Sequence, residues 1–331
     1  MKSVSAASVA GMLNNWAAAS QSDKLGPLLP MRQLTRDGLK TTAFGMGGWH
    51  LGMAEDPKQA EAMIEYSMEQ GVRFYDNARV YGKGRAEEYY GKFLVPKYRE
   101  HVCIMTKSFS FTREDALKNL DESLTAMKTD YVDIWQIHSL DTYEGVDKRI
   151  KGGVVDAFLE AKQKGKAKYI GFTGHQNPRS HVYFLKKLKE MGVEMDVSQM
   201  PLNICDASYE SFQQMVLPTL LEREYGVLAM KTFAGGSIMG RRFEVTPKEL
   251  QDEDIPDVVR LTGLSLAQLH EYVYSLPVSV LISGCKTVDE LEQNIAVLKG
   301  LTLLREERME EIEKLAQPYS GYCVENYKRL L

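Results

Sequence analysis

The feature that most constrains this chain is an alternation of short β-rich runs and amphipathic helical stretches, which recurs eight times after Pro30. The first helical stretch illustrates the pattern. Asp56 can cap its N-terminus and Pro57 suits the first helical position. Apolar residues then recur at intervals of three and four until Gly71, which can end the helix. Eight strand–helix units favour a closed (β/α)8 TIM barrel of the α/β class over an open sheet.

The expected elements have the following bounds. Strands are expected at 41–46, 72–76, 102–106, 131–137, 168–172, 195–198, 226–231 and 278–282. Helices are expected near 57–70, 84–94, 113–128, 152–165, 178–191, 208–224, 263–275 and 287–298, with another near 303–316.

Three segments lie outside these repeats. Residues 31–39 predict a short hairpin with an Asp37-Gly38 turn, a pair that such turns favour. Residues 232–262, after the seventh strand, have little periodicity, and long irregular connections usually act as lids or clamps. A C-terminal extension follows the last repeat. We therefore expect one barrel domain at 30–331, preceded by an N-terminal segment at 1–29.

The N-terminal segment has two interpretations. Residues 2–22 are rich in Ala and Ser and only mildly apolar, which is typical of a tail. They also resemble the remnant of a twin-arginine export signal, but both arginines would have to lie upstream of Met1. As it stands the chain lacks an export signal, so a cytoplasmic location is expected, and export is the alternative if a longer N-terminus carries such a signal.

Composition argues against several classes of function. The net charge is −4 and no basic block is present, so nucleic-acid binding is not expected. The four cysteines are widely spaced, which predicts neither a metal or iron–sulfur site nor a disulfide framework. No apolar run approaches the roughly 18 residues that a membrane span needs.

Polar side chains follow three consecutive predicted strands. Asp76, Lys107 and His138 each stand where a strand ends, and Tyr81 follows Asp76 by five positions. Because parallel barrel strands direct their carboxyl ends to one face, these four groups should meet in one pocket. An ammonium paired with a carboxylate would lower the pKa of a neighbouring phenol. Such a phenol can protonate the alkoxide that develops when hydride adds to a carbonyl, while the imidazole orients that carbonyl.

The motifs FYDNARVYG, MTKSF and DYVDIWQIH resemble those of the aldo-keto reductases, and the resemblance runs from Met31 to about Leu298. It implies a catalytic tetrad of Asp76, Tyr81, Lys107 and His138, with Tyr81 as the proton donor. The implied function is reduction of an aldehyde or ketone to an alcohol by hydride transfer from a nicotinamide cofactor. The partner would be a small carbonyl compound.

A nicotinamide dinucleotide would not be held by a Rossmann unit, because the chain lacks a strand–GxGxxG–helix motif. The resemblance instead implies an extended cofactor across the barrel mouth. Near the nicotinamide it implies Gly47, Gly48, Asp76, Thr173 and Gln199. The usual asparagine is replaced by Gly174, for which His175 either compensates or caps the next helix.

The resemblance implies further contacts along the same cofactor. After the seventh strand they are Met230, Lys231, Phe233 and Gly235, with Met230 in place of the usual stacking aromatic and Arg241 and Arg242 in the loop beyond. After the eighth strand they are Lys286, Glu290, Gln293 and Asn294. Lys286 suits the 2′-phosphate of NADP(H), whereas Glu290 would repel it and favour NAD(H). NADP(H) is favoured by the resemblance, and NAD(H) is the alternative.

The substrate pocket is expected to be built by Trp49, Phe109, the 232–262 loop and the C-terminal tail. Two other functions stay open. One is a Schiff-base lyase with Lys107 as the nucleophile, which needs a neutral amine. The other is a non-catalytic nicotinamide-sensing subunit, like channel-associated relatives of this family. The oligomeric state is also left open.

Overall fold

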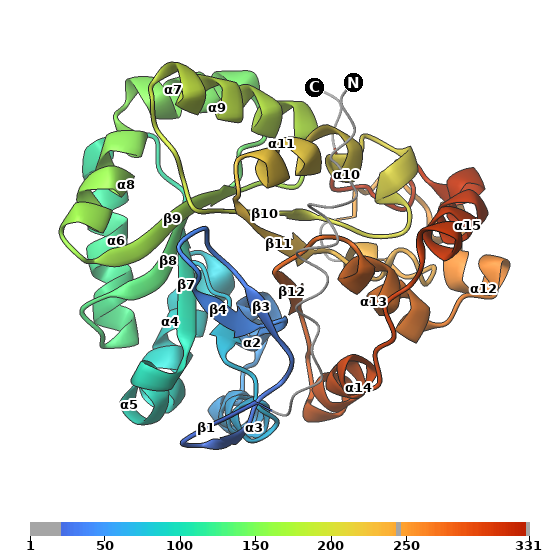
Figure 1. The fold of residues 1–331 in the computed structure, drawn as a ribbon, viewed down its shortest axis with the longest axis horizontal. Coiled ribbons are helices and arrows are strands. Elements are labelled where there is room, and N and C mark those ends of the chain that lie inside the picture. The colour runs from blue at the N-terminus through green and yellow to red at the C-terminus, as the bar shows by residue number, and fades with distance from the viewer. Residues whose placement is uncertain (1–20, 243–245, 329–331) are drawn as a thin grey trace.

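Eight parallel strands close into a barrel in the computed structural model, which describes residues 21–242 and 246–328 (Figure 1). In chain order the barrel strands are β5 (Phe44–Met46), β6 (Phe74–Tyr75), β7 (Cys103–Ser108), β8 (Val132–Ile137), β9 (Ala167–Thr173), β10 (Val197–Pro201), β11 (Gly226–Met230) and β12 (Val280–Ser283). Each strand pairs with the next, and β12 closes the ring by pairing with β5. The expected (β/α)8 barrel is confirmed.

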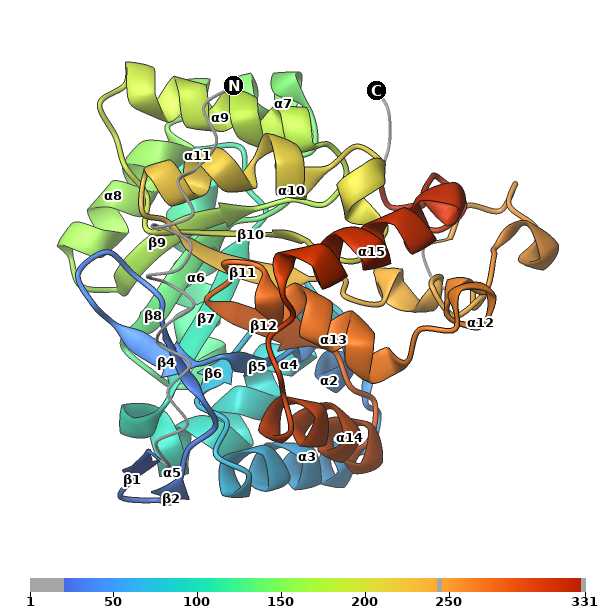
Figure 2. The same ribbon diagram turned by 45° about the vertical axis from the view of Figure 1, so that its right-hand side comes forward.

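Helices surround the barrel (Figures 1 and 2). They are α2 (Gly48–Met53), α3 (Pro57–Glu69), α4 (Arg85–Tyr89), α5 (Val95–Tyr98), α6 (Arg113–Met127), α7 (Tyr143–Lys151), α8 (Val154–Gln163), α9 (Pro178–Glu190), α10 (Phe212–Met215), α11 (Leu217–Glu222), α12 (Val258–Thr262), α13 (Leu266–Ser275), α14 (Val288–Lys299) and α15 (Glu306–Ala316). A π-helical turn, Tyr90–Leu94, joins α4 to α5. Across the described residues, none of these helices is both long and apolar enough for a membrane span.

A hairpin closes the amino-terminal end of the barrel. Strands β3 (Met31–Gln33) and β4 (Lys40–Thr42) pair antiparallel around the expected Asp37-Gly38 turn. Between them Leu34 is 1% exposed and joins the apolar cluster inside the barrel. The other members of this cluster are Phe74, Cys103, Met105, Ile134, Val197, Leu228, Val280 and Ile282. The carboxyl end of the barrel is therefore the end left for a site.

The described part of the expected N-terminal segment packs against the barrel. Strands β1 (Ser22–Asp23) and β2 (Gly26–Pro27) form a small hairpin, and Asp23 pairs with Arg73 at 2.7 Å. The Leu29 N–H donates to the Gly71 carbonyl at 3.1 Å. Most of the segment that carries the export-signal hypothesis lies outside the described residues.

Two expected elements were wrong in their bounds. The strand expected at 41–46 is two strands, because the chain leaves the hairpin sheet at Ala43, whose N–H donates to the Pro30 carbonyl at 2.8 Å. The helix expected at 208–224 is two short helices. Pro218 lies in the first turn of the second helix, where its missing N–H costs no helical hydrogen bond.

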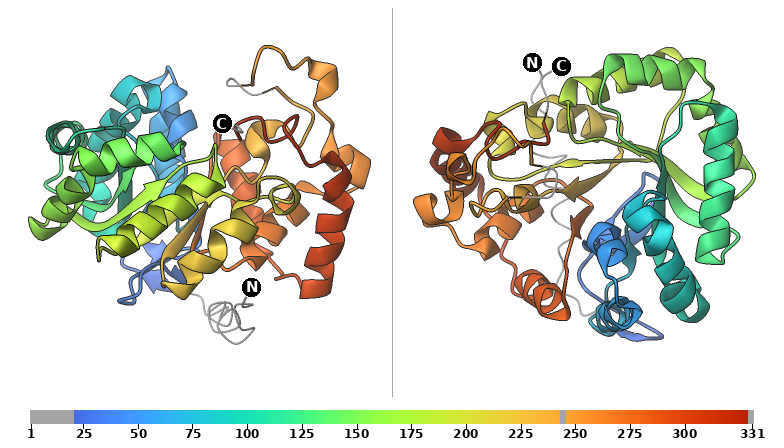
Figure 3. Two further views of the ribbon diagram at one scale, coloured as in Figure 1. Left: turned by 90° about the horizontal axis from the view of Figure 1, so that it is seen from above. Right: turned by 180° about the vertical axis from the view of Figure 1, so that it is seen from behind.

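Other differences concern the connections. Helices α2 and α7 were not expected from the sequence. The 232–262 connection contains α12 and a bridge between Met239 and Asp257, although residues 243–245 lie outside the described structure. The C-terminal extension begins with α15, close to the expected bounds, and this helix lies beside α12 and α13 (Figure 3).

Candidate active site

Polar side chains reach the barrel mouth because alternate residues of each strand point inward. On β7, Met105 belongs to the interior cluster and Lys107 follows two residues later. On β6, Phe74 belongs to the same cluster and Asp76 again follows two residues later. His138 comes directly after β8. Strand parity thus directs the expected groups into one layer at the carboxyl end.

Lys107 is the centre of this layer. Its Nζ donates to Asp76 Oδ1, to the Asn77 carbonyl at 2.7 Å and to the Tyr81 hydroxyl oxygen at 3.1 Å. Lys107 is 1% exposed and Asp76 is 3% exposed. All three hydrogens of the ammonium are therefore engaged. The contact with Asn77 was missed in the sequence, although this residue lies inside the FYDNARVYG motif.

Burial is the largest influence on the pKa values of Asp76, Lys107 and Tyr81. Burial raises the pKa of Asp76 and lowers the pKa of Lys107, and their direct contact opposes both shifts. Burial also raises the pKa of Tyr81 well above its ordinary value, and the Asp76 carboxylate adds to this. A net lowering by the ammonium, expected from the sequence, is thus not found, because burial dominates. The phenol keeps its proton at neutral pH, which a proton donor requires.

Two rings flank Tyr81. Trp49 meets it edge to face with ring centroids 5.4 Å apart, and His138 does so at 5.9 Å. Burial lowers the pKa of His138 well below its ordinary range. The positive charges of Lys107, His175 and Arg149 act on this pKa in the same direction. The imidazole is therefore neutral near pH 7, and it lies beside the phenol as the tetrad requires.

Thr173 and Gln199 form the clearest candidate cofactor contact. They stand opposite one another in the register of β9 and β10 and are 2% and 1% exposed. Gln199 Oε1 is buried and has no hydrogen-bond partner among the described residues. An acceptor without a partner at this depth suits an amide N–H of a ligand. These residues therefore fit the carboxamide of a nicotinamide ring.

The replacement of asparagine by Gly174 has a packing reason. A Cβ atom at this position would lie 2.7 Å from His181 Nε2 and 2.9 Å from the Leu140 carbonyl oxygen. His175 does not cap the next helix, because the Asn177 side chain accepts from the first turn of α9 instead. His175 instead packs against Tyr327, with ring centroids 6.0 Å apart.

Gly47 and Gly48 allow close packing at the end of β5. The Gly47 N–H donates to the Ser283 carbonyl at 2.8 Å. A Cβ atom on Gly48 would lie 2.4 Å from the Asp76 carbonyl oxygen, so no side chain fits there. Gly47 therefore packs against the end of β12, and Gly48 packs against the backbone of Asp76.

The expected contact residues at and after the end of β11 do not all face the same part of the structure. The Lys231 carbonyl accepts from Asn203 Nδ2 at 3.3 Å, and burial lowers the pKa of the Lys231 amine to about 8. Met230 ends the strand, half-buried, and Gly235 lies in the turn that follows. The Phe233 ring packs on His270 at 4.7 Å and so lies toward α13.

After β12, two of the expected contact residues, Glu290 and Asn294, form hydrogen bonds within the protein. Glu290 Oε2 accepts from the Lys286 backbone N–H at 2.7 Å, at the start of α14. The Lys286 and Gln293 side chains are exposed, and Asn294 Nδ2 donates to Ser283 Oγ at 3.0 Å. A carboxylate therefore occupies the helix end at which a 2′-phosphate was expected.

Phe109 and Arg242, also expected at the site, have their contacts with other residues than the tetrad. Phe109 is 49% exposed and packs edge to face on Phe111 at 5.5 Å. Arg242 donates to Asp252 Oδ1 at 2.8 Å and so is engaged within its own loop.

A buried charge cluster from the C-terminal tail was missed in the sequence. Lys328 Nζ donates to Asp206 Oδ1 at 2.6 Å, to Glu325 Oε2 at 2.8 Å and to the Tyr209 carbonyl at 2.7 Å. The three charged side chains are at most 1% exposed. The cluster holds Tyr327, whose ring lies 5.5 Å from Lys231 Nζ, against the mouth.

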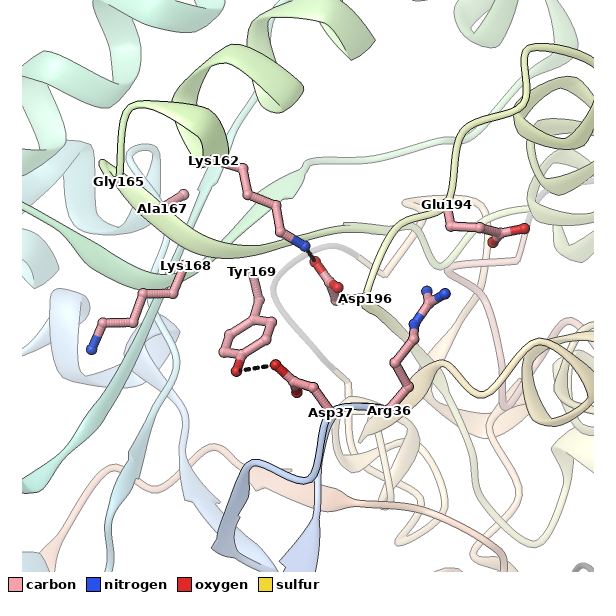
Figure 4. A pocket seen from close by; sticks show the side chains of 9 residues that line it. All are labelled: Arg36, Asp37, Lys162, Gly165, Ala167, Lys168, Tyr169, Glu194 and Asp196. Carbon is pink, nitrogen blue, oxygen red and sulfur yellow. Dashed lines mark hydrogen bonds and ion pairs between the residues drawn. The ribbon is translucent and has the colours of Figure 1, made fainter.

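A hollow lies at the opposite end of the barrel, beside the starts of β9 and β10 (Figure 4). Its volume is about 650 Å³. Two contacts lie within its lining: Lys162 pairs with Asp196 at 2.6 Å, and the Tyr169 hydroxyl donates to Asp37 at 2.9 Å. None of the expected site residues lines it, so it is not the candidate active site.

Comparison with known proteins shows the family of this chain. The family model "Aldo/keto reductase family" matches residues 43–317, so the chain belongs to this family. An "L-galactose dehydrogenase" of Arabidopsis thaliana is 27% identical over 88% of this chain and 95% of its own length. A "Probable voltage-gated potassium channel subunit beta" of Oryza sativa subsp. japonica is 26% identical over 86% of this chain and 96% of its own.

Among solved structures, the holo form of aldo-keto reductase AKR11C1 from Bacillus halodurans has the same fold, with a TM-score of 0.72. It is 21% identical, and the match covers 87% of this chain and 96% of that one.

Proposed function

We propose that this protein reduces an aldehyde or ketone to an alcohol, with Tyr81 giving the proton and a bound nicotinamide supplying the hydride. The observation that carries the proposal is the contact of Lys107 with both Asp76 and the Tyr81 hydroxyl oxygen. Lys107 donates to that oxygen, so the phenol's own hydrogen is available to a substrate. Membership of the aldo/keto reductase family supports the same chemistry.

In the proposed reaction, negative charge develops on the carbonyl oxygen of the substrate as its carbon receives hydride. Tyr81 transfers its proton to that oxygen and becomes a phenolate. The adjacent Lys107 ammonium, held by Asp76, stabilises the phenolate charge. His138 is neutral and can donate one hydrogen bond to the carbonyl, which orients it toward Tyr81.

The proposed cofactor is NADP(H), with NAD(H) as the alternative. Gln199 and Thr173 would hold the nicotinamide carboxamide, and Lys231 would meet the pyrophosphate. Lys286 would meet the 2′-phosphate of NADP(H) through its exposed amine, a point charge suited to phosphate. Glu290 opposes this preference, because its carboxylate lies at the same helix end.

The test is Tyr81→Phe, with NADPH binding followed by fluorescence and turnover followed on a panel of aldehydes and ketones. We expect turnover to fall at least about a hundredfold, since one general acid contributes this much, and the Kd for NADPH to stay within twofold. Tyr75→Phe is the matched control. This tyrosine is also buried, but its hydroxyl forms a hydrogen bond of 2.7 Å with Ser67 Oγ and not with a residue of the tetrad. Unchanged turnover in Tyr81→Phe would refute the assigned role.

Two alternatives remain testable in the same experiments. A non-catalytic sensing subunit is supported by the channel-subunit relative, and it predicts cofactor binding and partner pull-down without turnover. A Schiff-base lyase needs a neutral Lys107. The three hydrogen bonds of that ammonium argue against it, and borohydride trapping with a carbonyl substrate would detect it.

A further inference from the structure

Among the described residues, none forms a hydrogen bond with the ring of His138. Its Nδ1 is buried and has no partner among the described residues. The ring contact is the edge-to-face packing on Tyr81, with an angle of 78° between the planes. A hydrogen bond to one ring nitrogen commonly sets the orientation of a functional histidine. Here the orientation must come from the backbone that carries the ring.

That backbone turns sharply directly after the ring. The His138 N–H still bonds the Ser108 carbonyl at 2.9 Å, as a strand residue would. The next residue, Ser139, has φ of +59°, in the left-handed region that residues with a side chain rarely adopt. Leu140 then donates to the Thr173 carbonyl at 2.9 Å. The turn directs the His138 carbonyl away from the strand ladder, where it needs another donor.

Arg149, on α7, provides this donor. Its Nη2 donates to the His138 carbonyl and its Nη1 to the Gly145 carbonyl, both at 3.1 Å. The side chain is 1% exposed, and its guanidinium stacks over the Phe111 ring at 4.3 Å. The planar fork of an arginine suits two fixed acceptors at once.

The charge and position of Arg149 are both secured. Burial lowers its pKa to about 10, opposed by Asp141, so it stays cationic near pH 7. The end of α7 is held to the start of α6, because the Arg113 N–H donates to the Gly152 carbonyl at 2.8 Å. Arg149 itself joins three elements: the end of β8 and the first turn of α7 through hydrogen bonds, and the loop after β7 through the Phe111 ring.

We propose that Arg149 is the positioning residue for His138, holding the left-handed turn that aims the imidazole at Tyr81 and at the substrate carbonyl. The inference rests on the proposed function for its effect on turnover. Its structural part, the orientation of the His138 ring, does not depend on turnover and can be measured without it.

The chain offers a matched control for the loss of a buried arginine. Arg32 is 5% exposed and bonds two backbone carbonyls, those of Val278 and Tyr274, each at 2.7 Å. Burial lowers its pKa to about 10, as for Arg149. It lies on the hairpin at the closed end of the barrel, so Arg32→Met tests what a buried arginine does for stability alone.

The experiment compares Arg149→Met, Arg149→Lys and Arg32→Met in the full chain, each also combined with His138→Gln. Steady-state kinetics on the best carbonyl substrate, cofactor binding by fluorescence and NMR of histidine-labelled protein are recorded. His138→Gln assigns the His138 signals. We expect Arg149→Met to lower kcat about 10- to 100-fold, the size that misplacement of a catalytic group can reach. The Kd for NADPH should stay within twofold, and Arg149→Lys should recover part of kcat.

Two results define the role. In the His138→Gln background, Arg149→Met should cost less than about threefold, because residues that act through one another are not additive. The His138 ring signals should shift in Arg149→Met and stay unchanged in Arg32→Met. Equal losses of kcat in both backgrounds, or unshifted His138 signals, would overturn the proposal. If no carbonyl is turned over, the proposed function fails and the NMR comparison alone decides on Arg149.

Discussion

Removal of the Lys328 ammonium is the sharpest test of the tail cluster. Lys328→Met would leave the Asp206 and Glu325 carboxylates buried and without their shared cation. Breaking a buried ion pair from one side typically costs about 3–5 kcal/mol. The unfolding entropy, about 2.1 cal/mol/K per residue, amounts to about 0.7 kcal/mol per degree over 331 residues. We therefore expect Tm to fall by about 4–7 °C.

The assay is thermal unfolding followed by circular dichroism, together with limited proteolysis of the tail. Lys97→Met is the control, because Lys97 is 51% exposed in its pair with Glu65 and such pairs contribute about 1 kcal/mol or less. The tail should also become sensitive to protease, since its docking depends on the same contacts. A Tm within 1–2 °C of wild type, with a tail no easier to cleave, would refute the reasoning.

Two further predictions concern cofactor choice and pH. Glu290→Gln should tighten NADPH binding about two- to fivefold, the effect of one exposed charge, and change NADH binding less. Asp289→Asn, in the same exposed turn, is the control, and equal effects of both variants on NADPH titrations would contradict the role of Glu290. Burial lowers the pKa of His181 to about 3, and the unfolded chain binds this proton near pH 6.5. Between about pH 3 and pH 6.5, unfolding therefore takes up a proton. The free energy of unfolding thus decreases as the pH is lowered through this window. Urea unfolding at pH 7.5 and 5 should show that His181→Leu removes about 2 kcal/mol of this loss; an unchanged difference between the two pH values would argue against it.

The barrel and the core of the candidate site were predictable because their signals are local. Strand parity and a strand end place Asp76 and Lys107, and a five-residue offset places Tyr81 near them. The bounds that were wrong have physical reasons that are less visible in sequence. A continuous β-rich run at 41–46 serves two different sheets, and Pro218 divides a region whose apolar period suggested one helix.

The direction of the Tyr81 pKa shift was also not predictable from the sequence. Proximity of a cation is implied by the motif, but the extent of burial is a property of the packed mouth, and here burial together with the Asp76 carboxylate raises the pKa of Tyr81. The same holds for Gln199, whose buried acceptor without a partner is visible only in the assembled barrel.

The sequence by itself determined the eight-unit barrel and the chemical types of the groups at its mouth, because periodicity and strand ends are encoded within short segments. Tertiary structure alone decided how those groups are held. Arg149 reaches His138 from α7, a helix that was not expected from the sequence, and Lys328 contacts Asp206 across 122 positions of chain. Contacts of this kind depend on where separate elements pack, and no local pattern records that.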